Sequence, residues 1–316
     1  MVARVLNFEV TPELLSGAAS LVRAILWNKA FRAPMDANFD LTWRCNLRCE
    51  HCYFSASIRS TKPAGWRPRE LSDDQWRRVF RYFRARGTRS ASLTGGEPTL
   101  RMNLVEEAVR VFPAVQVATN GLVPIPRHLN CAIWVSLDGK PETHDKIRGA
   151  KCFHRVVENM TDDPRVSVSC TLSTTNYREA EFVVETCARA NVKGVFFMLY
   201  GGTKDSPLFL RGKKLAATVR SLRRLVHEFP DFVLLSERML ASYVTKDFVP
   251  TCCFLGENAL VQSFFPDLTR KRCVMGDNVD CQTCSCIVPV ASHCLRALDG
   301  DTAKKVVTIL RQDRGT

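Results

Sequence analysis

The sequence has no uninterrupted run of the ~18 apolar residues that a membrane-spanning helix needs. Its N-terminal residues lack the apolar core and cleavage site of a secretory signal peptide. We find no internal repeat, no low-complexity tract and no recognisable nucleic-acid-binding module. We therefore expect a cytoplasmic globular protein that does not bind nucleic acid.

The composition is that of an ordinary globular protein, except for its charge. Of 316 residues, 46% are hydrophobic and 24% are charged, which suits one large α/β domain with a smaller extension. The net charge of +13 favours an anionic partner: a phosphorylated small molecule, nucleic acid or an anionic membrane surface. A solvated, arginine-rich surface is the alternative explanation.

Fourteen cysteines are many for a chain of this size, and most of them cluster. Such a number would indicate disulfides in a secreted protein, whereas clustered cysteines in a cytosolic protein indicate metal binding. Three lie within residues 45–52, and seven lie between residues 252 and 294. We expect the four scattered ones to be small buried hydrophobic residues: Cys131, Cys152, Cys170 and Cys187.

Strand-like and helix-like segments alternate through the middle of the chain. The pattern predicts six strands, at residues 37–42, 89–94, 115–119, 132–137, 166–172 and 194–199. It predicts five helices, at residues 73–86, 103–112, 154–160, 178–190 and 213–228. Ser72 and Gln75 form a capping box at the start of the first helix. Alternating β and α units indicate a parallel sheet.

Two further segments flank this region. Residues 1–35 form a leader, in which apolar residues at helical spacing predict a helix over residues 14–31. This helix either packs on the bottom of the main domain or lies on a membrane surface with Trp27 in the lipid. From residue 236 the alternation is lost and cysteines accumulate, which indicates a small cysteine-rich extension over residues 236–316.

The most informative motif is formed by Cys45, Cys49 and Cys52, spaced C-x3-C-x2-C directly after the first predicted strand. Three thiolates on one short loop hold three irons of a cubane [4Fe–4S] cluster and leave the fourth iron open to a ligand. An open coordination position is typical of a catalytic metal site. A zinc ion, with Glu50 or His51 beside it, is the alternative.

This loop, followed by Tyr53, resembles that of the radical S-adenosylmethionine (radical SAM) enzymes. Four more motifs follow in that family's order, at residues 95–98 (GGEP), 119–121 (TNG), 135–139 (VSLDG) and 144–149 (HDKIRG). Together they resemble the subgroup that contains molybdenum-cofactor cyclase, the peptide maturases and adenosyl-hopane synthase. The resemblance covers residues 36–235 and implies an α/β fold, a partial (β/α)6 TIM-like barrel with its chemistry at the C-terminal ends of the strands.

The resemblance also implies roles for residues near these strand ends. The loop cysteines would ligate the cluster, whose open iron would bind S-adenosylmethionine, and one electron would cleave it to methionine and a 5′-deoxyadenosyl radical. Glu97 is expected to accept a hydrogen bond from the methionine ammonium, and Asp138 is the candidate catalytic residue. The other candidate cofactor-binding residues are Tyr53, Gly95, Gly96, Asn120, Ser136 and Arg148. A simple turn is the alternative role for Asn120 and Asp138, because each precedes a glycine.

The C-terminal cysteines predict a second metal site. Relatives often carry an auxiliary [4Fe–4S] cluster in such an extension, and we expect its ligands to come from Cys253, Cys273, Cys281, Cys284 and Cys286. Their spacing departs from the seven-cysteine pattern of the peptide maturases, which counts against a peptide substrate. A loop of buried thiols is the alternative.

The sequence favours a radical SAM enzyme that acts on a small-molecule biosynthetic intermediate, which is phosphorylated, a nucleotide or a lipid. The alternatives are a peptide-modifying maturase and a non-catalytic metal-binding module that senses redox state or binds nucleic acid. A radical SAM methyltransferase is disfavoured, because we see no cobalamin-binding domain upstream. We expect a low-potential electron donor, such as a flavodoxin or a ferredoxin, and peripheral membrane contact.

Overall fold

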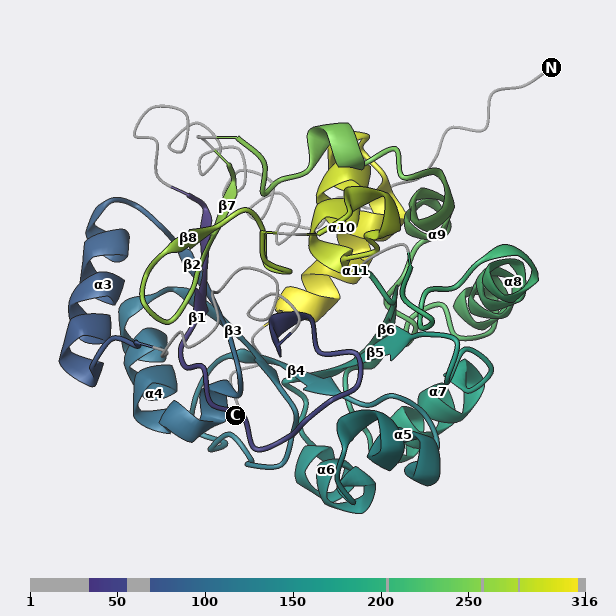
Figure 1. Ribbon diagram of the computed structural model, residues 1–316, viewed down its shortest axis with the longest axis horizontal. Helices are drawn as coiled ribbons and strands as arrows, with labels where there is room; N and C mark the ends of the chain where they lie inside the picture. The colour runs from purple at the N-terminus through teal and green to yellow at the C-terminus, as the bar shows by residue number, and fades with distance from the viewer. Residues whose placement is uncertain (1–33, 56–68, 203–204, 257–258, 278, 312–316) are drawn as a thin grey trace.

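A computed structural model describes residues 34–55, 69–202, 205–256, 259–277 and 279–311. The helix expected over residues 14–31 lies outside the described residues. Within them, the architecture is a curved sheet with helices packed on its outer face (Figure 1). None of the described helices combines the length and the apolar character that crossing a membrane requires.

Six parallel strands form the body of the sheet, each where the sequence pattern predicted one. They are β1 (Asp36–Asp40), β2 (Ser90–Thr94), β3 (Ala114–Thr119), β4 (Ala132–Ser136), β5 (Val166–Leu172) and β6 (Gly194–Leu199). Each strand pairs in parallel with the next along the chain. Figure 1 shows the strands curving around one open side, which confirms the predicted α/β partial barrel.

The five predicted helices are also present: α3 (Asp73–Ala85), α4 (Met102–Val111), α6 (Phe153–Met160), α7 (Ala180–Arg189) and α8 (Gly212–Glu228). Ser72 caps α3 through the predicted capping box with Gln75. The pattern missed the short 3₁₀ helix η1 (Pro98–Arg101) and α5 (Pro141–Arg148). Only Ile147 is a large apolar residue in α5, so it shows no helical apolar period.

Alternate side chains along each strand face opposite sides of the sheet, and the two sides differ in polarity. On the outer side, Phe39 of β1 packs against the rings of Trp76 and Phe80, with centroids 5.5 and 5.4 Å away. On the inner side, Asn38 and Ser92 line a cavity. The four scattered cysteines are all buried, as expected.

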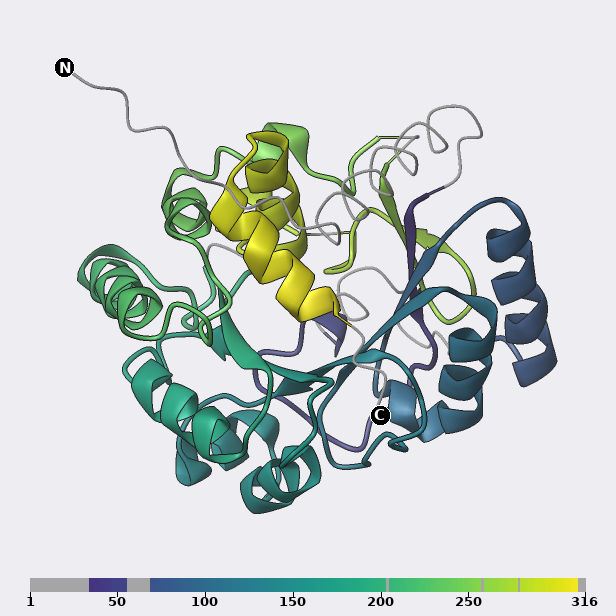
Figure 2. The same ribbon diagram turned by 180° about the vertical axis from the view of Figure 1, so that it is seen from behind.

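The cysteine-rich extension continues the same sheet. After α9 (Glu237–Thr245), strand β7 (Val261–Phe264) pairs in parallel with β1, and β8 (Arg270–Lys271) pairs antiparallel with β7. The short helices η2 (Val249–Thr251) and η3 (Cys281–Thr283) lie on either side of these strands in the chain. Figures 1 and 2 show that α10 (Ile287–Arg296) and α11 (Gly300–Leu310) lie across the open side of the curved sheet.

Candidate active site at the mouth of the partial barrel

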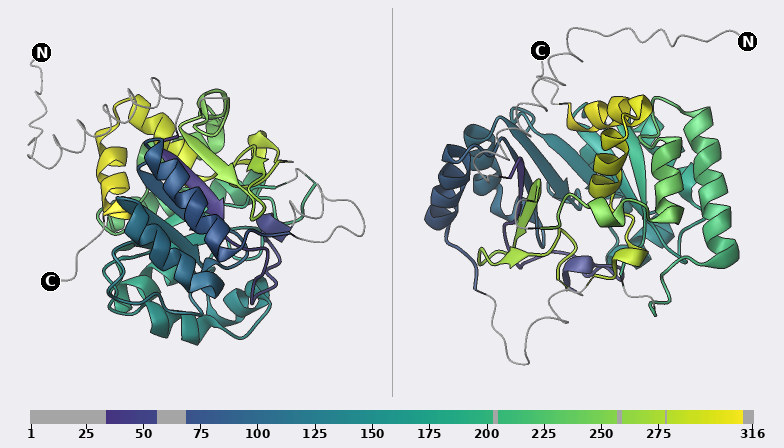
Figure 3. Two further views of the ribbon diagram at one scale, coloured as in Figure 1. Left: turned by 90° about the vertical axis from the view of Figure 1, so that its left-hand side faces the viewer. Right: turned by 90° about the horizontal axis from the view of Figure 1, so that it is seen from above.

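A cavity of about 240 Å³ lies at the C-terminal ends of the strands. The predicted cluster and cofactor residues that line it are Cys45, Cys49, Cys52, Tyr53, Gly95, Gly96, Glu97, Asn120, Ser136 and Arg148. Cys284 and Cys286 of the extension also line this cavity, and Figure 3 shows the extension beside the segment that follows the cysteine loop. The fold therefore brings both groups of cysteines to one site.

The sulfurs of the three loop cysteines do not all lie within 4.8 Å of one another. In the described part of the chain, the one group of three or more candidate metal ligands whose atoms all lie within 4.8 Å of one another is formed by His144, Asp145 and Cys152. Sulfurs on one tetrahedral zinc ion lie roughly 3.8 Å apart, given Zn–S bonds of about 2.3 Å. The wider spacing of the loop cysteines fits a cluster in which each cysteine binds its own iron.

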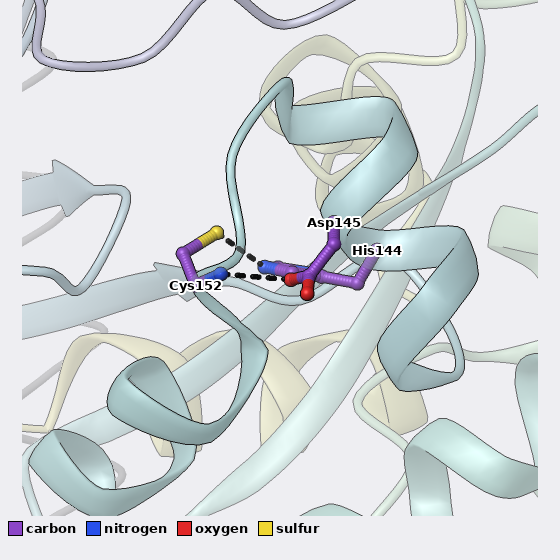
Figure 4. Close-up of side chains that lie close together, drawn as sticks. All are labelled: His144, Asp145 and Cys152. Atoms are coloured by element: carbon purple, nitrogen blue, oxygen red, sulfur yellow. Dashed lines mark hydrogen bonds between the residues drawn. The ribbon is translucent and has the colours of Figure 1, made fainter.

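His144, Asp145 and Cys152 lie close together because they form a hydrogen-bond network (Figure 4). The Asp145 carboxylate accepts hydrogen bonds from the backbone N–H groups of Cys152 and Phe153, both at 2.8 Å, at the start of α6. His144 Nδ1 accepts a hydrogen bond from the backbone N–H of Asp138 at 3.1 Å. Its Nε2 therefore carries the ring proton and lies 3.4 Å from Cys152 Sγ. The network fixes the backbone at Asp138.

Gly95 and Gly96 pack against the chain that leads into the cysteine loop. The Gly96 N–H donates to Thr42 O, and the Glu97 N–H donates to Arg44 O, both at 2.9 Å. A Cβ atom at Gly96 would lie 2.0 Å from Arg44 O, and Gly95 has a φ of +116°. The two glycines therefore allow two backbone segments to approach each other closely, and they also line the cavity.

Glu97 is buried and accepts four hydrogen bonds from the protein. Its Oε1 accepts from the Thr99 N–H, the Thr99 hydroxyl and the Thr119 hydroxyl. Among the described residues, its Oε2 accepts only from the Asn120 N–H, at 2.8 Å. Burial raises the pKa of Glu97, and these hydrogen bonds oppose that rise. Because each carboxylate oxygen offers about two lone-pair sites, Oε2 keeps one acceptor position for a ligand.

Asn120 connects the end of β3 to the cysteine loop. Its Nδ2 donates to Asn46 Oδ1 at 2.7 Å, and its Oδ1 accepts from the Leu122 N–H at 3.0 Å. The residue therefore forms the turn that the dipeptide predicted and also lines the cavity. Tyr53 lines the same cavity, and desolvation raises the pKa of its hydroxyl well above the ordinary value.

The structure places Asp138 behind the cavity wall, not in it. Its carboxylate is fully buried, with Oδ2 2.5 Å from Arg148 Nη2 and Oδ1 accepting from the Thr171 N–H at 2.9 Å. Although burial raises the pKa of Asp138, the Arg148 guanidinium holds that pKa below its usual range. Arg148 itself lines the cavity, and its Nε–H has no hydrogen-bond partner among the described residues. Arg148 therefore brings a positive charge to the cavity wall, and Asp138 holds the guanidinium in place.

Several inward-facing residues of the late strands also line the cavity, and the sequence did not single them out. They are Ser169 and Thr171 of β5, Met198 of β6 and Tyr200 just after it. Their positions follow the alternation of a strand, in which every second residue faces the inside. Polar residues at every second position of a buried strand are the signal that would have found Ser169 and Thr171.

The extension gathers five cysteines around a second, smaller cavity: Cys252, Cys273, Cys281, Cys284 and Cys286. Cys253, which the sequence placed among the ligands, is buried and lines the cavity on the inner face of the sheet instead. Adjacent residues thus line different cavities, and the group that the fold assembles contains Cys252 and not Cys253.

Comparison with known proteins identifies relatives that match part of the chain. The chain is 36% identical over 187 residues to the sporulation killing factor maturation protein SkfB of Bacillus subtilis, a match that covers 54% of this chain and 43% of that protein. It is 42% identical over 135 residues to GTP 3',8-cyclase of Klebsiella pneumoniae, covering 37% of this chain and 38% of the cyclase. The chain thus spans less than half the length of these relatives.

Solved structures share the fold. Streptococcus suis SuiB bound to the precursor peptide SuiA matches with a TM-score of 0.59 and 14% identity, covering 88% of this chain and 69% of SuiB. Among families, the Radical SAM superfamily model matches residues 41–236, which is more than half of the chain. This match spans the cysteine loop, the glycine pair and the Arg148 site, and the chain therefore belongs to the radical SAM superfamily.

Proposed function

We propose that this chain is an enzyme that reductively cleaves S-adenosylmethionine at a [4Fe–4S] cluster held by Cys45, Cys49 and Cys52. The observation that carries this proposal is the one cavity that the three cysteines share with Glu97 and Arg148. When bound, the cluster supplies the electron that converts S-adenosylmethionine into methionine and a 5′-deoxyadenosyl radical. The protein contributes binding, orientation and exclusion of water.

The two charged cavity residues match the two charged groups of the methionine moiety. Glu97 Oε2 has a free acceptor position for the ammonium, and the Arg148 guanidinium supplies a positive charge at the cavity wall for the carboxylate. Hydrogen bonds between charged groups are roughly twice as strong as hydrogen bonds between neutral groups. The Glu97 and Arg148 side chains are buried and held by neighbouring residues, so they need little reorganisation when the cofactor binds.

We further propose that the substrate presents an uncharged, largely apolar carbon skeleton to the site. Among the described lining residues, Glu97 and Arg148 are the charged ones, because burial lowers the pKa of His51 to about 4. With both engaged by the cofactor, a phosphate would find no further cation among the described lining residues, and an unpaired buried charge is costly. Met198, Ile287 and Val288 supply an apolar wall. This favours a lipid or an uncharged metabolite over a nucleotide.

A second cluster, held by four of the five cysteines around the smaller cavity, is part of the proposal. No three of these sulfurs lie within 4.8 Å of one another, a spacing wider than that of ligands on one ion, and this supports a cluster as the occupant. Burial raises the pKa of Cys284 to about 11, so the thiolate form depends on a bound cation.

The test of the main activity is anaerobic. The protein is reconstituted with iron and sulfide, mixed with S-adenosylmethionine and dithionite, and 5′-deoxyadenosine is quantified by mass spectrometry. We expect product from the native chain and from a Cys187→Ala control, and none from the triple variant Cys45→Ala, Cys49→Ala, Cys52→Ala. Equal product from the triple variant would show that the loop is not the reactive site.

The second cluster is tested by counting iron and sulfide on that same triple variant. Iron should remain, and a further Cys252→Ala change should lower it, whereas Cys253→Ala should not. A triple variant without iron would exclude the second cluster. Iron that falls with Cys253→Ala and not with Cys252→Ala would show that Cys253, and not Cys252, is a ligand.

A further inference from the structure

The three loop cysteines differ in the hydrogen bond that each sulfur accepts. Cys45 Sγ accepts from the Leu47 backbone N–H at 3.4 Å, and Cys52 Sγ accepts from the Ser55 backbone N–H at 3.3 Å. Cys49 Sγ instead faces the Arg148 guanidinium, whose Nη1 donates at 3.8 Å. One sulfur of the three is therefore paired with a full positive charge.

This charge is shielded from solvent and fixed in position. The Arg148 side chain is 10% exposed and the Asp138 side chain is fully buried. Asp138 is held by the Thr171 N–H on its carboxylate, by His144 on its backbone N–H and by Asn176 Nδ2 on its carbonyl oxygen at 3.0 Å. A charge in such a low-dielectric setting acts on its neighbours far more strongly than a surface charge does.

Hydrogen bonds to the sulfurs and nearby charge are among the features that set the reduction potential of an iron–sulfur cluster. Reduction adds one electron, and thus one negative charge, to the cluster. A cationic donor on Cys49 Sγ stabilises that added charge and raises the potential, whereas the Asp138 carboxylate behind it opposes the effect.

We propose that Arg148 raises the reduction potential of the loop cluster through its contact with Cys49 Sγ, and that Asp138 is a positioning residue that holds the guanidinium there. This rests on the proposed function, because it needs a cluster on the loop. It gives Asp138 a role through Arg148 and not through contact with substrate. Arg148 thus contacts Cys49 Sγ through Nη1 and Asp138 through Nη2.

The test is a redox titration of the reconstituted protein without S-adenosylmethionine or substrate, with the reduced cluster followed by electron paramagnetic resonance. The cysteine triple variant serves as background, so that signal from any second cluster can be subtracted. For Arg148→Met, the ratio of reduced to oxidised cluster at a fixed potential should fall about tenfold, a shift of about 59 mV for a one-electron couple. For Asp138→Asn, the amide oxygen can still accept from the guanidinium while the opposing charge is gone, so the potential should move in the opposite direction. Asp138→Leu releases the guanidinium and should give a lower potential than Asp138→Asn, which tests the positioning role.

Arg48→Met is the matched control, since Arg48 is the residue before Cys49 but is solvent-exposed; its potential should stay near the native value. If Arg148→Met does not take up iron, the double variant with Asp138→Asn removes both buried charges and should still titrate below the native protein. An unchanged potential in the Arg148 variant, or shifts of the same sign in Arg148→Met and Asp138→Asn, would overturn the inference. If the native loop forms no cluster at all, the proposed function fails first.

Discussion

Replacing Lys271 with methionine should destabilise the fold by about 3–5 kcal/mol, the cost of removing one partner from a buried ion pair. Lys271 Nζ lies 2.6 Å from Asp40 Oδ2, and the two side chains are 1% and 0% exposed. Methionine keeps the apolar length of the side chain but leaves the Asp40 carboxylate buried without a countercharge. Lys271 also donates to Val274 O, so the segment around Cys273 would lose an anchor.

Urea unfolding of the metal-free protein, followed by tryptophan fluorescence, measures this loss. The double variant Asp40→Asn, Lys271→Met removes both charges and should regain most of the lost stability, because neutral partners need no countercharge. Burial raises the pKa of Asp40 even beside Lys271, and removing Lys271 raises it further.

A carboxyl group with a raised pKa in the folded state contributes stability that is present at low pH and lost as the pH rises. The difference in unfolding free energy between the native chain and the Lys271→Met variant should therefore narrow as the pH falls and Asp40 becomes protonated. A loss below about 1 kcal/mol, the value of a surface pair, would refute the reasoning. So would a gap that widens toward low pH.

Two further variants probe the frame of the site. Gly96→Ala places a Cβ atom 2.0 Å from Arg44 O. It should cost roughly 2–4 kcal/mol in unfolding free energy and lower the iron bound per chain. The control is Gly201→Ala, whose new Cβ atom would have its nearest neighbour 3.4 Å away, and equal melting temperatures for the two variants would contradict the argument. Arg165→Met removes the buried cation beside Asp163, which keeps only the half-exposed Arg127 at 3.4 Å, and takes a donor from three backbone carbonyls of the β3–β4 connection. Because Arg127 remains, the cost by chemical unfolding should lie below the roughly 3–5 kcal/mol of a fully broken buried pair. A loss within experimental error would show that the connection does not depend on Arg165.

The strands and most helices could be predicted because their signals are local. Each of the six strands is a short apolar or alternating run, and Ser72 with Gln75 announces a helix start through contacts three residues apart. The candidate cavity residues were found for a related reason, since parallel strands of one sheet end at the same edge. α5 escaped prediction because it is short and mostly polar, and its helical state depends on packing.

The sequence could not predict pairings between residues that are far apart in the chain. The parallel pairing of β7 with β1, and the Lys271–Asp40 ion pair beside it, join segments whose separation leaves no periodic trace. Nor could it predict that Asp138 lies behind Arg148, because a strand-end aspartate looks the same in a cavity and in the wall.

By itself, the sequence determined the order of the βα units, the cysteine loop and the motifs that place this chain in its family. The tertiary structure alone decided which of Cys252 and Cys253 joins the second group of cysteines. It also decided that Arg148 is the charged partner of Cys49 Sγ. The physical reason is that local patterns specify elements, whereas the packing of those elements decides which side chains meet and which groups lose contact with water.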